Sequence, residues 1–211
     1  LCFVFSVHSV YAHVVSNDSM RIVALIDSAK AHEYQLKYAL KELDSAYRLT
    51  KYTHAEQLSA KVLMEKGDLY LKNSLLAEAD SNFVQARKIM DSFPKDEDYL
   101  ELIRRQAVCS YFSGDYQRVL RLALEGLKDA GIQRNKSFTA TFYNILGVAY
   151  LGMGDQTAAL NYYLKALDIF KHLHQPDKIA SVESNIGIIY QNQGNIKEAQ
   201  KIGRASCRER V

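Results

Sequence analysis

The chain repeats itself with a period of 40 residues, and this period constrains its fold more than any other feature. A pattern of small and aromatic residues centred on Gly147 returns at Gly187, 40 positions later. A third clear copy is centred on Gly67, and weaker copies are centred on Ala107 and Asp27. Residues at matching places in these copies are Tyr70, Ala79, Phe83, Ala86, Gly114, Tyr150, Ala159, Tyr163, Ala166, Tyr190 and Ala199. A regular period of this length predicts an array of stacked supersecondary units.

Apolar residues in each copy fall three and four positions apart, which indicates amphipathic helices. Two such helices fit in 40 residues. Gly114, Gly154 and Gly194 mark a break in the middle of a copy, where Gly can take the positive φ that ends a helix. Asp or Asn after this break can cap the next helix. Pro94 and Pro176 fall between copies, where a new helix begins. The expected helices cover residues 19–33, 35–50, 54–73, 75–92, 97–113, 115–130, 136–153, 155–173 and 176–193, with another from 195 onward.

Small residues at two places in each copy predict a close contact between its two helices. At the Gly147 and Ala159 positions, a larger side chain would push the helices apart. We expect the aromatic ring of Tyr150 or Tyr163 to fill the space beside this contact.

The motif Leu146-Gly147-x-x-Tyr150, followed by Ala159-x-x-x-Tyr163 and Ala166, resembles the tetratricopeptide repeat (TPR) pattern. The resemblance covers residues 20–201 and is weakest in the first repeat, as is common for a capping repeat. It implies an all-α fold, a right-handed TPR superhelix (α-solenoid) of about five antiparallel helix pairs with the last pair truncated. The repeats lie near residues 20–59, 60–99, 100–139, 140–179 and 180–201.

The period is longer than the 34 residues usual for TPR. The long form, and the segment around residues 161–195 in particular, resembles the extracytoplasmic TPR sensor arrays of Bacteroidetes-type signalling proteins. That resemblance implies a signal peptide, a membrane helix and a histidine kinase or DNA-binding output around the array. Neither the membrane helix nor the output lies within these 211 residues.

The N-terminal segment, residues 1–12, is an apolar run that ends in Val10-Tyr11-Ala12. Val10 and Ala12 are small residues at the two positions that a signal peptidase reads. We therefore expect a remnant of a secretory signal peptide followed by a short linker, residues 13–19. Alternatives are a buried first element and a retained membrane anchor. Export, most simply to the periplasm, is therefore expected, with a cytoplasmic location as the alternative.

The C-terminal segment, residues 202–211, does not follow the repeat. Gly203 stands where an aromatic residue is due, and Ser206 stands where an Ala is due. The segment resembles a common sequencing adapter translated in frame, so we expect it to be non-native. The alternative is a basic interaction tail. Without its three Arg and one Glu, the net charge falls from +3 to +1, too small to predict nucleic-acid binding.

No catalytic or cofactor motif is present, so we expect neither enzyme activity nor a cofactor. His172 and His174 have a spacing that could bind a metal, but their place at a turn between repeats favours a solvated loop. Cys109 lies in an apolar helical stretch and is expected to be a buried, unreactive thiol.

In TPR arrays the first helix of each repeat lines a concave groove, so the resemblance assigns partner binding to that face. The predicted partner is a protein, a peptide or a second copy of the chain, with membrane attachment only through segments outside this sequence. Arg104 and Tyr111 are the preferred anchors, since Arg and aromatic residues dominate interface hot spots. The predicted partner-binding residues are Lys72, Arg104, Tyr111, Asn144, Leu151, Gln191 and Asn192.

Overall fold

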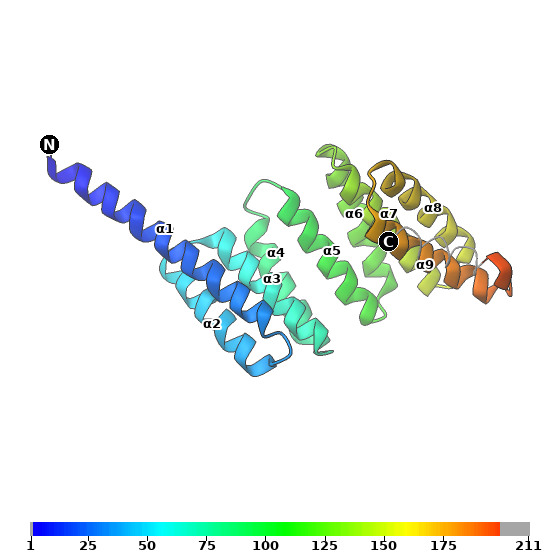
Figure 1. Cartoon of the computed structure of the whole chain (residues 1–211), viewed down its shortest axis with the longest axis horizontal. Helices are drawn as coiled ribbons and strands as arrows, with labels where there is room; N and C mark the ends of the chain where they lie inside the picture. Colours follow the sequence, from blue (N-terminus) through cyan, green and yellow to red (C-terminus); the bar gives the residue numbers. More distant parts are fainter. Residues whose placement is uncertain (1, 199–211) are drawn as a thin grey trace. The chain divides into compact units, whose positions relative to one another are not determined.

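The computed structural model describes the backbone of residues 2–198 and the side chains of residues 17–198, and it confirms the all-α fold class (Figure 1). The helices form two compact units, Leu1–Lys95 and Asp96–Val211, which we call the N-terminal and C-terminal units. The N-terminal unit contains α1 (Cys2–Ala31), α2 (Leu36–Tyr52), α3 (Glu56–Lys72) and α4 (Leu76–Met90). The C-terminal unit contains α5 (Glu97–Phe112), α6 (Tyr116–Ile132), α7 (Lys136–Gly152), α8 (Gln156–His172) and α9 (Pro176–Asn192).

From α2 to α9 the predicted helix ranges are confirmed to within about two residues, the usual uncertainty of helix ends. A further helix begins at Ile196, as expected, and is described as far as residue 198. The predicted start of the first helix near residue 19 is wrong, because α1 already begins at Cys2. Residues 2–31 contain neither Gly nor Pro, so nothing in the backbone chemistry interrupts the helix there. Residues 13–19 are therefore helical, and the signal-peptide assignment of residues 1–12 stays a prediction.

One type of turn ends most of the helices. Gly114, Gly154 and Gly194 have φ of 74°, 87° and 72°, which confirms their predicted role at the middle of each repeat. The N–H of the residue after each of them donates to a carbonyl five residues back, as from Asp155 to Tyr150 at 2.9 Å. This pattern is the Schellman motif. The same turn also occurs with non-glycine residues at positive φ, namely His54, Ser74, Arg134 and His174.

These turns recur every 20 residues, so they join the helices within a repeat and between repeats alike. From position 54 to position 194, position 94 is the exception, because it holds a proline, whose ring restricts φ to about −65°. The chain forms a longer loop there, and the boundary between the two units falls directly after Pro94, at Lys95.

Asp and Asn side chains cap the helices that follow several of these turns. Asp115 and Asp155 accept hydrogen bonds from the N–H groups of Arg118 and Ala158, both at 2.9 Å, which confirms the predicted caps. Asn135 and Asp96 act in the same way between repeats.

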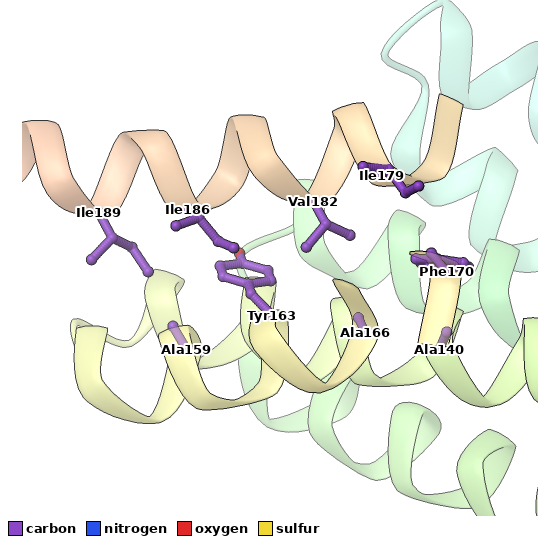
Figure 2. Close-up of a cluster of buried hydrophobic side chains, with 9 residues drawn as sticks. All are labelled: Ala140, Ala159, Tyr163, Ala166, Phe170, Ile179, Val182, Ile186 and Ile189. Atoms are coloured by element: carbon purple, nitrogen blue, oxygen red, sulfur yellow. The ribbon is translucent and has the colours of Figure 1, made fainter. Parts of the chain in front are cut away.

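The close helix contact predicted at the small residues is confirmed. A Cβ atom added to Gly147 would lie 2.4 Å from the ring of Tyr163, and one added to Gly67 would lie 2.5 Å from Phe83. Tyr163 fills the space beside this contact and is fully buried between α8 and α9, beside Ile186 (Figure 2). The buried residues at repeat positions are Ala79, Phe83, Ala86, Ala107, Ala159, Tyr163 and Ala166.

Tyr70, Tyr150 and Tyr190 are half-buried, which places the first-helix tyrosines at the edge of the core. Tyr150 stacks on Tyr162, with ring centroids 5.4 Å apart.

Ala199 lies outside the described residues. A Cβ atom at Gly187 would meet no described atom within 4 Å, and Gly203, which stands at the place of Tyr163 in the fifth repeat, lies outside the described residues too.

Candidate functional site

The predicted partner-binding residues lie on first helices of both units, and we call the six that lie in the C-terminal unit the first-helix face. Lys72 belongs to the N-terminal unit, and the other six belong to the C-terminal unit. Arg104 and Tyr111 are seven residues apart on α5, and Asn144 and Leu151 are seven apart on α7. A separation of seven residues is close to two helical turns, so each pair shares one side of its helix.

Lys72 ends α3, and its ammonium group donates to the carboxylate of Glu33, which follows α1. The hydrogen bond from Lys72, opposed by partial burial, lowers the pKa of Glu33, and the same bond raises the pKa of Lys72. Both groups therefore keep their charges near neutral pH. The sequence analysis missed Glu33, although it lies 39 residues before Lys72, close to one repeat period.

Arg104 makes a two-pronged ion pair on α5. Its Nε and Nη2 atoms donate to the two carboxylate oxygens of Glu101, both at 2.7 Å, and Arg105 Nε donates to the same carboxylate at 2.9 Å. Burial alone would raise the pKa of Glu101, but the hydrogen bonds and charges of the two arginines outweigh it and lower the pKa. Arg104 is thus held in a fixed orientation, half-buried, rather than extended into solvent.

Tyr111 and Phe112 place exposed aromatic surface at the end of α5. Their side chains are 39% and 61% exposed, and the two rings meet edge to face with centroids 5.6 Å apart. Tyr111 also lies 5.9 Å from the ring of Tyr116, at the start of α6. Neighbouring rings that support one another present a large apolar surface with little conformational freedom to lose on binding.

Asn144 connects two first helices by an amide pair. Asn185 Nδ2 on α9 donates to Asn144 Oδ1 on α7 at 3.1 Å, and the two residues are 41 positions apart. Leu151, further along α7, is half-buried and packs against the core cluster of α8 and α9. Gln191 and Asn192 are exposed at the end of α9. Asn185 was missed by the sequence analysis, and the 40-residue frame applied to Asn144 would have found it.

Tyr163 brings a hydroxyl into the core of the C-terminal unit, beside Ile186 (Figure 2). Tyr163 is fully buried, and within the described part of the chain no group lies in hydrogen-bond reach of its oxygen. Burial, followed by the nearby Tyr111, raises the pKa of Tyr163 above its usual value, so the hydroxyl stays neutral. The repeat pattern predicted an aromatic ring here but did not reveal that the hydroxyl would have no partner.

Across residues 17–198, His, Cys, Asp and Glu side chains nowhere gather in a group that could hold a metal ion. His172 ends α8, and His174 lies in the turn after it, as predicted. Cys109 is buried, which also agrees with the prediction. The described helices include none with the length and apolar character needed to cross a bilayer.

Comparison with known proteins agrees with this geometry. Residues 138–208 match the tetratricopeptide repeat family. A curated relative, the uncharacterized protein ycf37 of Pyropia yezoensis, is 30% identical over 82 residues, which are 39% of this chain and 43% of that protein. The chain therefore spans less than half of the length of this relative.

Solved structures with the same fold include a Rap protein complexed with competence and sporulation factor. The TM-score is 0.76 at 17% identity, over 90% of this chain and 54% of that one. A second is the signal transduction ATPase with numerous domains and a tetratricopeptide repeat sensor from Pyrococcus horikoshii. Its TM-score is 0.74 at 16% identity, over 94% of this chain and 31% of that one. The family match over residues 138–208 and these solved structures together show that the chain has a TPR-like fold.

Proposed function

We propose that the chain is a protein- or peptide-binding TPR module that holds its partner on the first-helix face. The observation that carries this proposal is the exposed ring pair of Tyr111 and Phe112. Large apolar side chains are normally buried in a soluble protein, and a cluster of them at the surface is typical of an interaction site. Aromatic anchors of this kind dominate the binding energy of many interfaces.

The neighbouring polar residues of the C-terminal unit suit a polypeptide partner. The amide pair of Asn144 and Asn185 offers donors and acceptors to a peptide backbone, and Gln191 and Asn192 extend the polar surface along α9. Arg104 is held by Glu101 and therefore has little side-chain freedom left to lose when a partner binds. TPR proteins are generally non-catalytic scaffolds, which supports a binding role for this surface.

A photo-crosslinking experiment tests this assignment. A photoreactive phenylalanine analogue replaces Phe112 in the full chain, and irradiation is done in extracts of the source cells. We expect a discrete crosslinked protein or peptide, whose yield falls at least about tenfold in Tyr111→Ala, as expected for a hot-spot residue. The same analogue at exposed Tyr52 of the N-terminal unit is the control and should give no such product. Equal crosslinking at both positions, or an unchanged yield in Tyr111→Ala, would contradict the proposal.

The proposal extends to the setting of the module: an exported sensory or scaffold part of a larger bacterial signalling protein. The motif at Ala12 and the resemblance to extracytoplasmic sensor arrays support this setting. The solved TPR sensor of the Pyrococcus horikoshii ATPase offers a precedent for a TPR array as the sensory part of a larger protein. A histidine kinase or DNA-binding output would then belong to the intact protein.

Cell fractionation of the intact gene product tests the export proposal. We expect the protein outside the cytoplasm, with its mature N-terminus at His13 by mass spectrometry. An uncleaved, cytoplasmic product would instead favour the alternative, a cytoplasmic TPR scaffold. A change of Ala12 to a bulky residue should block cleavage without changing the fold of residues 20–198, as judged by circular dichroism.

A further inference from the structure

The N-terminal unit contains a cavity that the partner-binding proposal does not use. It lies among α1, α2 and α3 and has a volume of about 200 Å³. Typical pockets for drug-sized ligands are roughly 300–1,000 Å³, so this cavity suits a ligand of about one amino-acid residue. Its lining contains three carboxylates and two ammonium groups.

The lining is arranged in layers from the inside outward. Ala29, Leu43 and Leu69 are buried and form an apolar floor contributed by three different helices. Above it lie carboxylates with little exposure, since the side chain of Glu65 is 16% exposed and that of Glu33 is 29% exposed. Asp68 of α3 adds a third, half-buried carboxylate.

The two lysines form the outermost layer. The side chains of Lys30 and Lys72 are 54% and 58% exposed, about twice as much as the carboxylates that they pair with. Lys30 Nζ lies 3.4 Å from Glu65 Oε2, and Lys72 donates to Glu33. The first pair joins α1 to α3, and the second joins the turn after α1 to the end of α3.

The arrangement of apolar floor, carboxylates and lysines indicates which class of ligand the cavity can bind. An anion would meet the partly buried carboxylates before it reached the floor, and partly desolvated like charges repel strongly. A purely polar cation would leave the apolar floor unfilled. A group that carries an ammonium directly beside a short aliphatic chain matches the floor and the carboxylates together.

We propose that this cavity binds an α-ammonium group with its aliphatic side chain, either as a free amino acid or as the first residue of a peptide. The aliphatic chain packs on Ala29, Leu43 and Leu69, and the ammonium group donates to Glu65 and Asp68. The exposed lysines then face the carboxylate of a free amino acid, or the first carbonyl group of a peptide. The proposal goes beyond the partner-binding function, because a ligand of this size is recognised whether or not a protein binds at Tyr111 and Phe112.

Calorimetric titration of the full, unmodified chain tests this with four probes: L-leucine, L-leucine amide, the dipeptide leucyl-alanine and N-acetyl-L-leucine. We expect binding of probes with a free ammonium group and at least about tenfold weaker binding of N-acetyl-L-leucine, since a charge-assisted hydrogen bond is lost. Binding of leucine alone identifies a free amino acid as the ligand. Binding of the amide and the dipeptide as well identifies a peptide N-terminus. No binding at millimolar concentration, or equal binding of N-acetyl-L-leucine, overturns the proposal.

Two variants and a control place the ligand in the cavity. Ala29→Leu fills the cavity and leaves every charge in place, so it should abolish binding. Glu65→Gln removes a carboxylate that is only 16% exposed and should weaken binding about tenfold or more. Asp44→Asn removes a carboxylate that pairs with Lys66 outside the cavity and should leave binding unchanged.

Circular dichroism establishes that each variant is folded. Unchanged binding in folded Ala29→Leu would refute the location. Should Glu65→Gln fail to fold, Asp68→Asn gives the same test of the carboxylate layer. Since crosslinking at Phe112 is a separate measurement, a failure of either proposal is recognised without reference to the other.

Discussion

The N-terminal and C-terminal units use the same repeat frame but carry different chemistry on their first helices. In the N-terminal unit, charged pairs join α3 to α1 and to the turn after it, through Lys30 with Glu65 and Lys72 with Glu33. In the C-terminal unit, an uncharged amide pair, Asn144 and Asn185, joins α7 to α9. The pair of Lys72 with Glu33 and the amide pair have sequence separations of 39 and 41 residues. The repeat period therefore sets the positions at which neighbouring first helices make contact. The residue types at those positions set whether the contact is an ion pair or a hydrogen bond between amides.

A second difference lies at the aromatic position of the second helix. Phe83 and Tyr163 occupy the same place in repeats that are 80 residues apart, and both are fully buried. Only the tyrosine brings a hydroxyl into the core, where it lacks a partner among the described residues. Substitutions at these two positions and at the glycines that their rings contact distinguish two contributions to the free energy of unfolding. One comes from the shared repeat position, and the other comes from the individual side chain.

The largest effect is expected for Phe83→Ala in the N-terminal unit. Removal of a fully buried ring should lower the free energy of unfolding by about 3–5 kcal/mol, because a cavity remains against Gly67. Urea denaturation followed by circular dichroism measures this change. Leu75→Ala, at a partly exposed position of the same unit, should change stability by less than about 0.5 kcal/mol. Similar losses for both variants would refute the assignment of Phe83 to the core.

Gly147→Ala should have the next largest effect. The new Cβ atom would lie 2.4 Å from the ring of Tyr163, and we expect a loss of about 1–3 kcal/mol from overpacking. Gly187→Ala is the matched control, since no described atom lies within 4 Å of its added Cβ. There the higher helix propensity of Ala should stabilise the protein by up to about 1 kcal/mol. Thermal unfolding should therefore shift in opposite directions for these two variants.

Exchange of the two aromatic residues should give a smaller effect of predictable sign. Tyr163→Phe removes a buried hydroxyl that has no partner and should raise the free energy of unfolding by about 1 kcal/mol. Phe83→Tyr should lower it by a similar or larger amount unless the new hydroxyl finds an acceptor. If Tyr163→Phe destabilises the protein, the hydroxyl has a hydrogen-bond partner in solution.

The smallest expected effect concerns the pH dependence of stability and Glu101. Its pKa in the folded protein lies below the ordinary value of 4.5, so the unfolded chain takes up the proton first as the pH falls. The stabilisation is complete above that ordinary value and is lost as the pH falls through the lowered pKa. Glu101→Gln should remove this part of the acid sensitivity, an effect below about 1 kcal/mol. Melting temperatures of both proteins, measured from neutral to acidic pH, should converge at the acidic end.

The sequence predicted most of the fold because its signals are local. Gly114 and Gly154 end helices at positive φ, and Asp115 and Asp155 cap the helices that follow, as their residue types suggest. The start of α1 was mistaken because an apolar segment without Gly or Pro contains no sign of where a helix begins. The breaks at Ser74 and Arg134 were predicted from the repeat, but their positive φ was not, since these residue types rarely adopt it.

The candidate site was less predictable than the fold. Periodicity located the first-helix face but could not show that Arg104 is engaged by Glu101, nor that Lys72 pairs with Glu33. Such pairs depend on the directions of long side chains, which sequence spacing does not determine.

By itself, the sequence determined the 40-residue period, the positions of the helices from α2 onward and the small residues at which helices touch. These follow from local backbone preferences and from the volume of single side chains, so they can be read along the chain. Only the tertiary structure decided that an apolar floor and three carboxylates surround one cavity, and that a tyrosine hydroxyl is buried without a partner. The cavity and the buried hydroxyl are both formed by atoms from different helices. Their energetic effect comes from the exclusion of water, which cannot be predicted from the order of residues along the chain.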